Sequence, residues 1–180
     1  MTSLKNIVLI GMSGSGKSTV GKYIADKLNK TFLDTDDIIV SNTGKNIEYI
    51  FDNYGEGYFR ELEKLVINSL SRKEDIIIST GGGIVLNPTN IEILKRKGII
   101  FFLNGSIDTL YQNVKKSKAS KEQRPLLREG DLKTKLEEIY NIRKSLYFNS
   151  GDYIISVDNR TVEEIGNEII KIFKTIIPCP

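Results

Sequence analysis

The stretch Gly11-Met12-Ser13-Gly14-Ser15-Gly16-Lys17-Ser18 follows the apolar run Ile7-Val8-Leu9-Ile10 and leads into a helical pattern from Lys17 to Leu28. The apolar run predicts a buried strand, and the apolar stripe after the loop predicts an amphipathic helix. Glycines allow the backbone between them to turn tightly and to direct its N–H groups at an anion in front of the helix. The order of strand, glycine-rich turn and helix therefore predicts a phosphate-binding loop for a nucleoside triphosphate.

Side chains of this loop have the chemistry that a triphosphate requires. Lys17 can reach the β- and γ-phosphates, and the Ser18 hydroxyl can ligate Mg²⁺. The nucleotide contacts are expected from six consecutive residues, Gly14, Ser15, Gly16, Lys17, Ser18 and Thr19.

Length and composition favour one soluble domain. The chain has 180 residues, of which 39% are hydrophobic and 27% are charged, and its net charge is +3. A domain of this size buries about 70% of the surface of its unfolded chain. No apolar stretch approaches the ~20 residues that span a bilayer, and the run at Ile7 is too short for a signal peptide. We expect a single domain over 1–180 that is cytoplasmic, monomeric and free of membranes, and its lone Cys179 cannot form an internal disulfide.

The positive charge is concentrated in one segment with few apolar residues. Its cations are Lys115, Lys116, Lys118, Lys121, Arg124 and Arg128. No aromatic side chains are interleaved there to stack on bases, which argues against nucleic-acid binding. We expect residues 115–130 to form a lid that is mobile when empty and closes over phosphates to exclude water.

Strand-like and helix-like patterns alternate along the chain, as is typical of an α/β fold with a parallel sheet. The later strands are expected at 31–33, 75–79, 99–103 and 153–157. Asn87 with Pro88 predicts a helix start that Gly98 closes, and Thr161 with Glu164 predicts a capping box. Residues 37–72 predict two or three successive helices, too many for a simple crossover. The predicted fold is a three-layer α/β/α domain with five parallel strands and a helical insertion.

Ligands of open parallel sheets bind beyond the carboxyl ends of the strands. Asp34 and Asp36 follow the second strand at a spacing that points both side chains to one side of an extended chain. One could serve Mg²⁺ and the other a substrate hydroxyl, or else Asp36 or Asp37 caps a helix that begins at Ile38. Because no acidic residue ends the third strand, Asp34 is the candidate metal ligand.

Bare backbone follows the third strand at Gly81-Gly82-Gly83. This triple glycine either keeps side chains away from a ligand or forms a flexible turn.

Two arginines look out of place on structural grounds alone. Arg143 continues the apolar stripe of Leu132, Leu136 and Ile139. A guanidinium on such a face needs a carboxylate from the protein or from a ligand. Arg60 lies three residues before Glu63, which fits a surface ion pair or a pair that orients Arg60 toward a ligand.

Taken in order, these motifs resemble the shikimate kinase family over essentially the whole chain. The family combines the phosphate loop with five further motifs, which stand here at Asp34 with Asp36, Phe59-Arg60 with Glu63, Gly81–Gly83, Arg124–Leu127, and Arg143 with Tyr147. The resemblance implies a P-loop kinase fold with a substrate-binding insertion at about 34–62 and a lid at about 115–130. It also implies transfer of the γ-phosphoryl group of ATP to the 3-hydroxyl of shikimate in aromatic biosynthesis.

The same resemblance implies a role for each matched residue. Lys17, Asp36 and Arg124 would be catalytic, with Arg124 also contacting ATP, and Ser18 with Asp34 would hold Mg²⁺. The acceptor would be bound by Asp36, Arg60, Gly82, Gly83 and Arg143, with the two arginines on its carboxylate. The chain departs from the family where an arginine is expected near the adenine. Lys116 is the nearest candidate there and Arg160 another, and a lysine cannot stack on a base as arginine does.

The sequence leaves other functions to be weighed. A gluconate kinase shares the fold and also needs an anion clamp, whereas a noncatalytic nucleotide-binding module would leave Arg143 and the two aspartates without a task. A GTPase would carry Asn-Lys-x-Asp, but Asn29-Lys30 is followed by Thr31-Phe32. Phosphoryl transfer needs positioning and charge neutralisation more than a covalent catalyst, so the absence of histidine is no obstacle.

Overall fold

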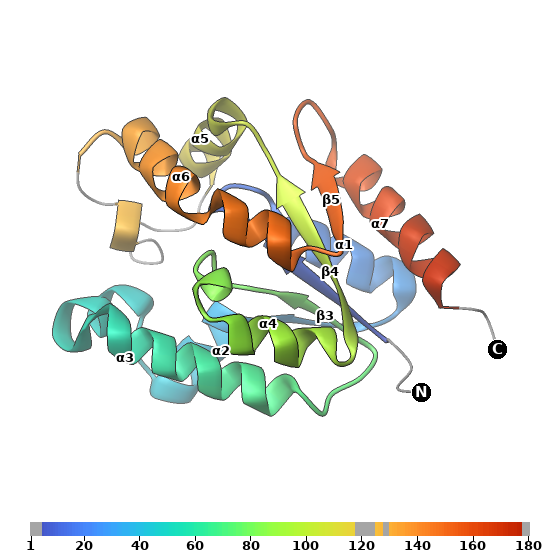
Figure 1. The fold of residues 1–180 in the computed structure, drawn as a ribbon, viewed down its shortest axis with the longest axis horizontal. Coiled ribbons are helices and arrows are strands. Elements are labelled where there is room, and N and C mark those ends of the chain that lie inside the picture. The colour runs from blue at the N-terminus through green and yellow to red at the C-terminus, as the bar shows by residue number, and fades with distance from the viewer. Residues whose placement is uncertain (1–4, 118–124, 128–129, 178–180) are drawn as a thin grey trace.

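The computed structural model describes residues 5–117, 125–127 and 130–177. Its five strands form one parallel sheet in the order β2-β3-β1-β4-β5. The strands are β1 (Asn6–Ile10), β2 (Thr31–Asp34), β3 (Ile76–Ser79), β4 (Gly98–Asn104) and β5 (Tyr153–Ser156). The predicted five-stranded parallel sheet is confirmed (Figure 1).

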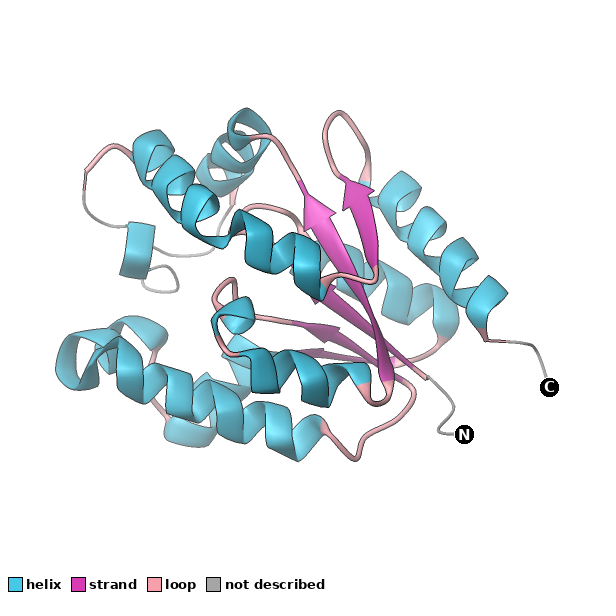
Figure 2. Ribbon diagram, in the orientation of Figure 1, coloured by secondary structure: helices cyan, strands magenta, loops and turns pink. Residues whose placement is uncertain are grey.

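Helices connect the strands and cover both faces of the sheet. They are α1 (Lys17–Leu28), α2 (Thr35–Thr43), α3 (Ile47–Leu70), α4 (Pro88–Lys95), α5 (Ile107–Lys116), α6 (Leu132–Ser150) and α7 (Val162–Ile176), with 3₁₀ turns η1 (Ile84–Leu86) and η3 (Pro125–Leu127). Figure 2 shows the sheet between α1 and α7 on one side and α3, α4 and α6 on the other.

Alternation of side chains along the central strands produces two separate cores. Ile7 and Leu9 of β1 pack with α1 and α7, while Val8 and Ile10 pack with the helices of the other face. Successive residues of a strand point to opposite faces, so a wholly apolar strand must be covered on both. The predicted three-layer α/β/α architecture is thereby confirmed.

Helix caps occur where the sequence predicts them. The Asn87 side chain accepts a hydrogen bond from the Thr89 N–H at the start of α4, with Pro88 in the first turn. Thr161 and Glu164 form the complete capping box of α7. Gly98 was expected to close the helix before β4, but it is the first residue of that strand, and α4 ends at Lys95. A Cβ at Gly98 would lie 2.9 Å from the Leu94 carbonyl oxygen, so close approach of helix and strand requires the glycine.

The predicted helical insertion consists of α2 and α3, and α3 is broken at Gly55, whose φ is 80°. Much of the predicted lid at 115–130 lies outside the described residues, including Arg124, Arg128, Lys118 and Lys121, as does Cys179, so the predicted mobility stays untested. Across the described ranges, no helix combines the length and apolar character needed to cross a membrane.

Candidate active site

Two cavities adjoin at the carboxyl edge of the sheet. The phosphate-loop cavity is lined by the glycine-rich turn, α1, α2 and the end of α5. The arginine cavity is lined by α3, α6, η3 and the triple glycine, and has a volume of about 560 Å³ including its open mouth. Both cavities share the wall formed by Ser13, Asp36, Ile47, Gly81 and Gly82.

The phosphate loop has the backbone that the sequence predicts. Gly11, Gly14 and Gly16 all have φ values between 85° and 148°, which side chains disfavour. A Cβ at Gly14 would also lie 2.5 Å from the Leu110 carbonyl oxygen of α5. These positions therefore require glycine on conformational grounds, and at Gly14 also because α5 is so close.

The Lys17 ammonium lies inside the loop. Its Nζ donates hydrogen bonds to the carbonyl oxygens of Gly11 (2.8 Å) and Met12 (2.9 Å). Gly14, Gly16, Lys17, Ser18 and Thr19 line the phosphate-loop cavity. Ser15, also expected to contact the nucleotide, is not among the described lining residues; it is buried, and its side-chain oxygen lies 3.4 Å from the same ammonium. The loop thus presents backbone groups and one cation to whatever occupies the cavity.

Oxygen ligands for a hard cation meet where β2 and β3 end. Asp34 and Ser79 pair across the two strands. The Ser18 hydroxyl donates to Asp34 Oδ2 at 2.8 Å and lies 3.2 Å from Ser79 Oγ. Within the described residues, no three or more His, Cys, Asp or Glu side chains gather where they could hold a metal ion. A hydroxyl and one carboxylate fit Mg²⁺, which keeps several waters and takes further ligands from phosphates. Ser79 was missed, although it is a polar residue at a strand end.

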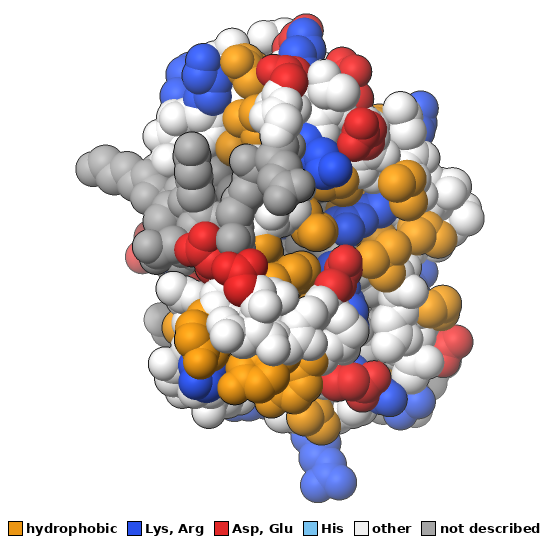
Figure 3. Space-filling model, turned by 90° about the vertical axis from the view of Figure 1, so that its left-hand side faces the viewer, with side chains coloured by type: hydrophobic (Ala, Val, Ile, Leu, Met, Phe, Trp, Pro, Cys, Tyr) orange, Lys and Arg blue, Asp and Glu red, His pale blue; other side chains and the backbone are white. Residues whose placement is uncertain are grey.

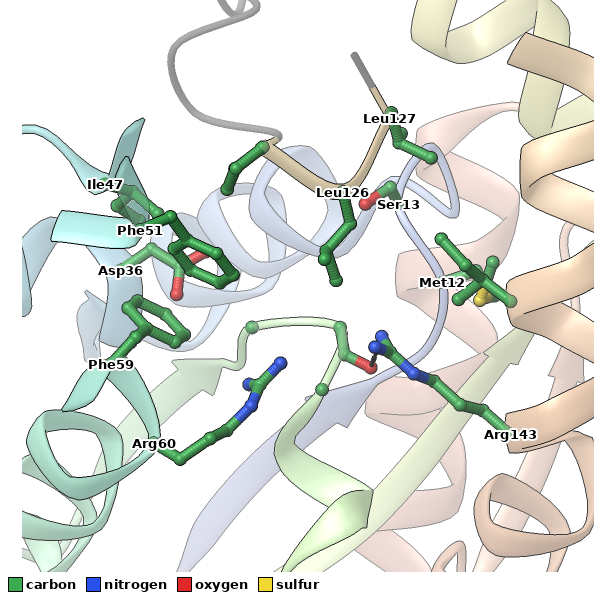
Figure 4. A pocket seen from close by; sticks show the side chains of 15 residues that line it. Met12, Ser13, Asp36, Ile47, Phe51, Phe59, Arg60, Leu126, Leu127 and Arg143 are labelled. Atoms are coloured by element: carbon green, nitrogen blue, oxygen red, sulfur yellow. Dashed lines mark hydrogen bonds between the residues drawn. The ribbon is translucent and has the colours of Figure 1, made fainter. Parts of the chain in front are cut away.

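Contrary to the expectation, the two aspartates do not share one extended segment, although both line the phosphate-loop cavity. Helix α2 begins at Thr35, and the Asp34 carboxylate caps it by accepting the Asp36 N–H at 3.0 Å. The alternative of a cap at Asp36 or Asp37 before Ile38 is wrong for the same reason. Because the cap is satisfied directly after β2, Asp36 lies in the first helical turn and faces the arginine cavity (Figure 4).

Asp36 is held in an unusual electrostatic environment. Burial, with Asp34 and Glu63 nearby, raises the pKa of its carboxyl to about 7. Its Oδ1 atom is buried and has no hydrogen-bond partner in the described structure. A buried carboxylate oxygen without a partner is costly, so this atom is suited to a ligand that donates a hydrogen bond.

Arg60 reaches the arginine cavity between two carboxylates. Its Nη1 lies 3.2 Å from both oxygens of Glu63, which is fully buried, and its Nη2 lies 2.7 Å from Glu56 Oε1. The Arg60–Glu63 pair is therefore not a surface ion pair, and its geometry orients the guanidinium. Burial raises the pKa of Glu63, while Arg60 opposes this. The Glu56 contact was missed, although its spacing of four residues from Arg60 is a known helix signal.

Arg143 lies on the buried face of α6, as the stripe predicts, and its exposed fraction is 8%. Its Nη1 donates to the Gly82 carbonyl oxygen at 3.1 Å. The guanidinium groups of Arg60 and Arg143 approach the triple glycine from α3 and α6 (Figure 4). Two cations from opposite sides of one small cavity make an anion site.

The triple glycine is needed for close approach of charged side chains. A Cβ at Gly83 would lie 2.2 Å from Arg60 Nη2, and one at Gly81 would lie 2.8 Å from Asp36 Oδ1. The glycines therefore make room for the protein's own charged groups beside the ligand space, which a merely flexible turn does not explain.

The two residues expected near the adenine, Lys116 and Arg160, lie in different surroundings. Lys116 lines the phosphate-loop cavity with Asn113, whose side chain donates to the Gly14 carbonyl at 2.9 Å. Arg160 is not among the described lining residues. Its guanidinium donates to the Ser156 and Glu164 carbonyls and pairs with Glu168 at 2.6 Å. In Figure 3, charged side chains of both signs lie together across the middle of the face shown.

Comparison with known proteins finds consistent similarity. The family model "Shikimate kinase" matches residues 13–174. A shikimate kinase of Caldicellulosiruptor bescii is 41% identical over 94% of this chain and 95% of its own, and one of Caldanaerobacter subterraneus subsp. tengcongensis is 39% identical over 94% and 96%. The structure of shikimate kinase from Acinetobacter baumannii in complex with shikimate matches with a TM-score of 0.89 and 32% identity, covering 97% of this chain and 95% of that one.

Proposed function

Because this chain belongs to the shikimate kinase family, we propose that its two adjoining cavities bind ATP and shikimate and bring the γ-phosphoryl group to the 3-hydroxyl. The enzyme phosphorylates shikimate with ATP, and the product is shikimate 3-phosphate. The observation that carries the proposal is the shared wall at Asp36, Gly81 and Gly82. Residues that line both cavities would place a phosphoryl donor next to its acceptor, and phosphoryl transfer depends mainly on such positioning.

Acceptor recognition is assigned to the arginine cavity. Arg60 and Arg143 bind the carboxylate of shikimate, with the Gly82 and Gly83 backbone beside it. Asp36 accepts hydrogen bonds from ring hydroxyls through the oxygen that has no protein partner. With a pKa near neutrality, this carboxylate can also take the proton from the attacking hydroxyl.

Nucleotide binding is assigned to the loop from Gly14 to Thr19. Phosphate oxygens take the place of the loop carbonyls as partners of the Lys17 ammonium. Ser18 and Asp34 would hold Mg²⁺, which supplies charge neutralisation on the phosphate oxygens when bound. Lys116 lies near enough to the same cavity to contact the nucleotide. Arg124 is proposed to close over the phosphates, and Arg160 to contact the adenine after leaving its partners on α7.

We also propose that the enzyme acts as a cytoplasmic monomer with no nucleic-acid or membrane partner. The basic segment lacks interleaved aromatic residues that would stack on nucleic-acid bases.

An acceptor panel tests the activity. With ATP and Mg²⁺, we expect transfer to shikimate and none to gluconate or AMP, measured by formation of the phosphorylated product. Transfer to gluconate or AMP alone would identify a related small-molecule kinase. Binding of ATP with no transfer to any acceptor would identify a noncatalytic nucleotide-binding module.

A further inference from the structure

The Gly82 carbonyl oxygen accepts two hydrogen bonds from one helix. One comes from Arg143 Nη1 at 3.1 Å and the other from the hydroxyl of Tyr147, one helical turn later. Tyr147 is fully buried, and its ring stacks on Phe102 with centroids 5.0 Å apart. Burial raises the pKa of the Tyr147 hydroxyl to about 12, so this group keeps its proton and remains a donor.

Gly82 is the residue through which this contact reaches the ligand space. It lines both cavities, and a Cβ added to it would lie 3.6 Å from the Gly11 carbonyl oxygen and 3.7 Å from the Ser13 nitrogen. The peptide after it is planar and trans, so its carbonyl and the next N–H point in opposite directions. Holding the Gly82 oxygen toward α6 therefore turns the Gly83 N–H away from α6.

The Tyr147 contact also affects Arg143. A guanidinium has five N–H groups in a fixed plane, and each one given to the protein is lost to a ligand. Without the tyrosine hydroxyl, the Gly82 oxygen would depend on Arg143 alone, and the peptide could rotate. Both changes would weaken the binding of an anion in the arginine cavity.

We propose that Tyr147 is a positioning residue for the acceptor: through the Gly82 carbonyl, it fixes the Gly82–Gly83 peptide, so that Arg143 gives this oxygen one N–H and keeps its other N–H groups for the acceptor carboxylate. This inference rests on the proposed function of the arginine cavity. It gives the second member of the Arg-x-x-x-Tyr pattern a task that packing against Phe102 does not require.

The test is the variant Tyr147→Phe, with Tyr140→Phe as the matched control. Tyr140 lies on the same helix, and its hydroxyl donates to Asn104 Oδ1 at 3.1 Å. Both variants lose one hydroxyl and keep the ring. We expect Tyr147→Phe to raise the KM for shikimate about tenfold, the loss of roughly one hydrogen bond, with kcat and the KM for ATP changed less than twofold. Tyr140→Phe should change the KM for shikimate less than twofold.

An acceptor that lacks the carboxylate shows whether Tyr147 acts on carboxylate binding or only on the general order of the cavity. For the carboxamide of shikimate, the KM of Tyr147→Phe should equal that of the wild type within twofold. An unchanged KM for shikimate, an equal rise in Tyr140→Phe, or an equal rise with the carboxamide would each overturn the inference. Because a KM does not depend on the amount of folded enzyme, a less stable variant still gives the readout. Activity of the wild type on shikimate tests the proposed function separately.

Discussion

The two cavities are built in different ways from the chain. On the nucleotide side, the proposed phosphate contacts come from consecutive residues, 14–19. On the acceptor side, the charged groups are side chains of α2, α3 and α6, and they span more than a hundred positions of the sequence from Asp36 to Arg143. A local motif carries its own geometry, whereas a dispersed charged site depends on the fold and on further side chains that hold it.

The cost of the two designs differs as well. Peptide N–H groups at a helix start are already part of the fold and need no counter-charge. Buried guanidinium and carboxylate groups lose hydration, so each needs a partner or a ligand. Glu63, Glu56 and the Gly82 carbonyl are such partners. We therefore expect changes on the nucleotide side to affect the rate of transfer, and changes on the acceptor side to affect the affinity for shikimate.

The largest effect is expected for Lys17→Met. Loss of the ammonium removes a charge that neutralises the transferring phosphoryl group, and kcat should fall at least about a thousandfold, or about 4 kcal/mol in the barrier. Lys27→Met on the same helix is the control, because Lys27 is exposed. Steady-state assays with saturating ATP measure the change. A loss confined to the KM for shikimate would break the proposed division between the two sides.

Arg143→Ala should have the next largest effect, and this effect should appear on the acceptor side. Removing one of two cations from a carboxylate site should raise the KM for shikimate about a hundredfold, in the range of a charged hydrogen bond. The KM for ATP should stay within threefold. Lys144→Ala, at the exposed neighbouring position on α6, is the control. Calorimetry on the same variants reports binding alone, and undiminished affinity for shikimate would remove Arg143 from the site.

The same contrast explains what the sequence could predict. The turn of the phosphate loop could be predicted because the glycines that allow its backbone conformation lie in one stretch. Arg143 could be located because a charge on an apolar stripe is conspicuous at helical spacing. The direction of Asp36 could not, because it depends on a helix starting three residues earlier than expected, once the Asp34 side chain caps it.

Contacts between distant segments account for the other misses. The Tyr147 hydroxyl meets Gly82 across 65 positions of the sequence, and Ser79 meets Ser18 across 61. Neither pair has a periodic signal in the sequence. The first depends on how α6 packs against the triple glycine, and the second on how β3 packs against the start of α1. Glu56, by contrast, could have been found from its spacing to Arg60 alone.

Protonation of Asp36 gives a smaller effect that depends on pH. Burial raises the pKa of this carboxyl to about 7, and the proposed role requires the deprotonated form. Activity should therefore be present above pH 7 and decline below it, with kcat/KM about tenfold below its plateau at pH 6. Asp36→Asn should have low activity without this dependence. If the wild-type profile is flat between pH 6 and 8, the free enzyme does not need to ionise this group.

Glu63→Gln should have the smallest effect, and it tests whether Glu63 is needed to orient Arg60 on the acceptor side. In the wild type, Arg60 Nη1 contacts both carboxylate oxygens of Glu63. Gln keeps the size of the side chain but offers Arg60 Nη1 only one neutral oxygen, or an amide N–H₂ that cannot accept a hydrogen bond. Arg60 would then be oriented by Glu56 alone, from one side. We expect the KM for shikimate to rise about fivefold and the melting temperature to fall, since a hydrogen bond to a charged group contributes about 1.5–3 kcal/mol. The control is Glu61→Gln, an exposed carboxylate on the same helix. A normal KM together with a lower melting temperature would mean that Glu63 stabilises α3 while Glu56 suffices to orient the arginine.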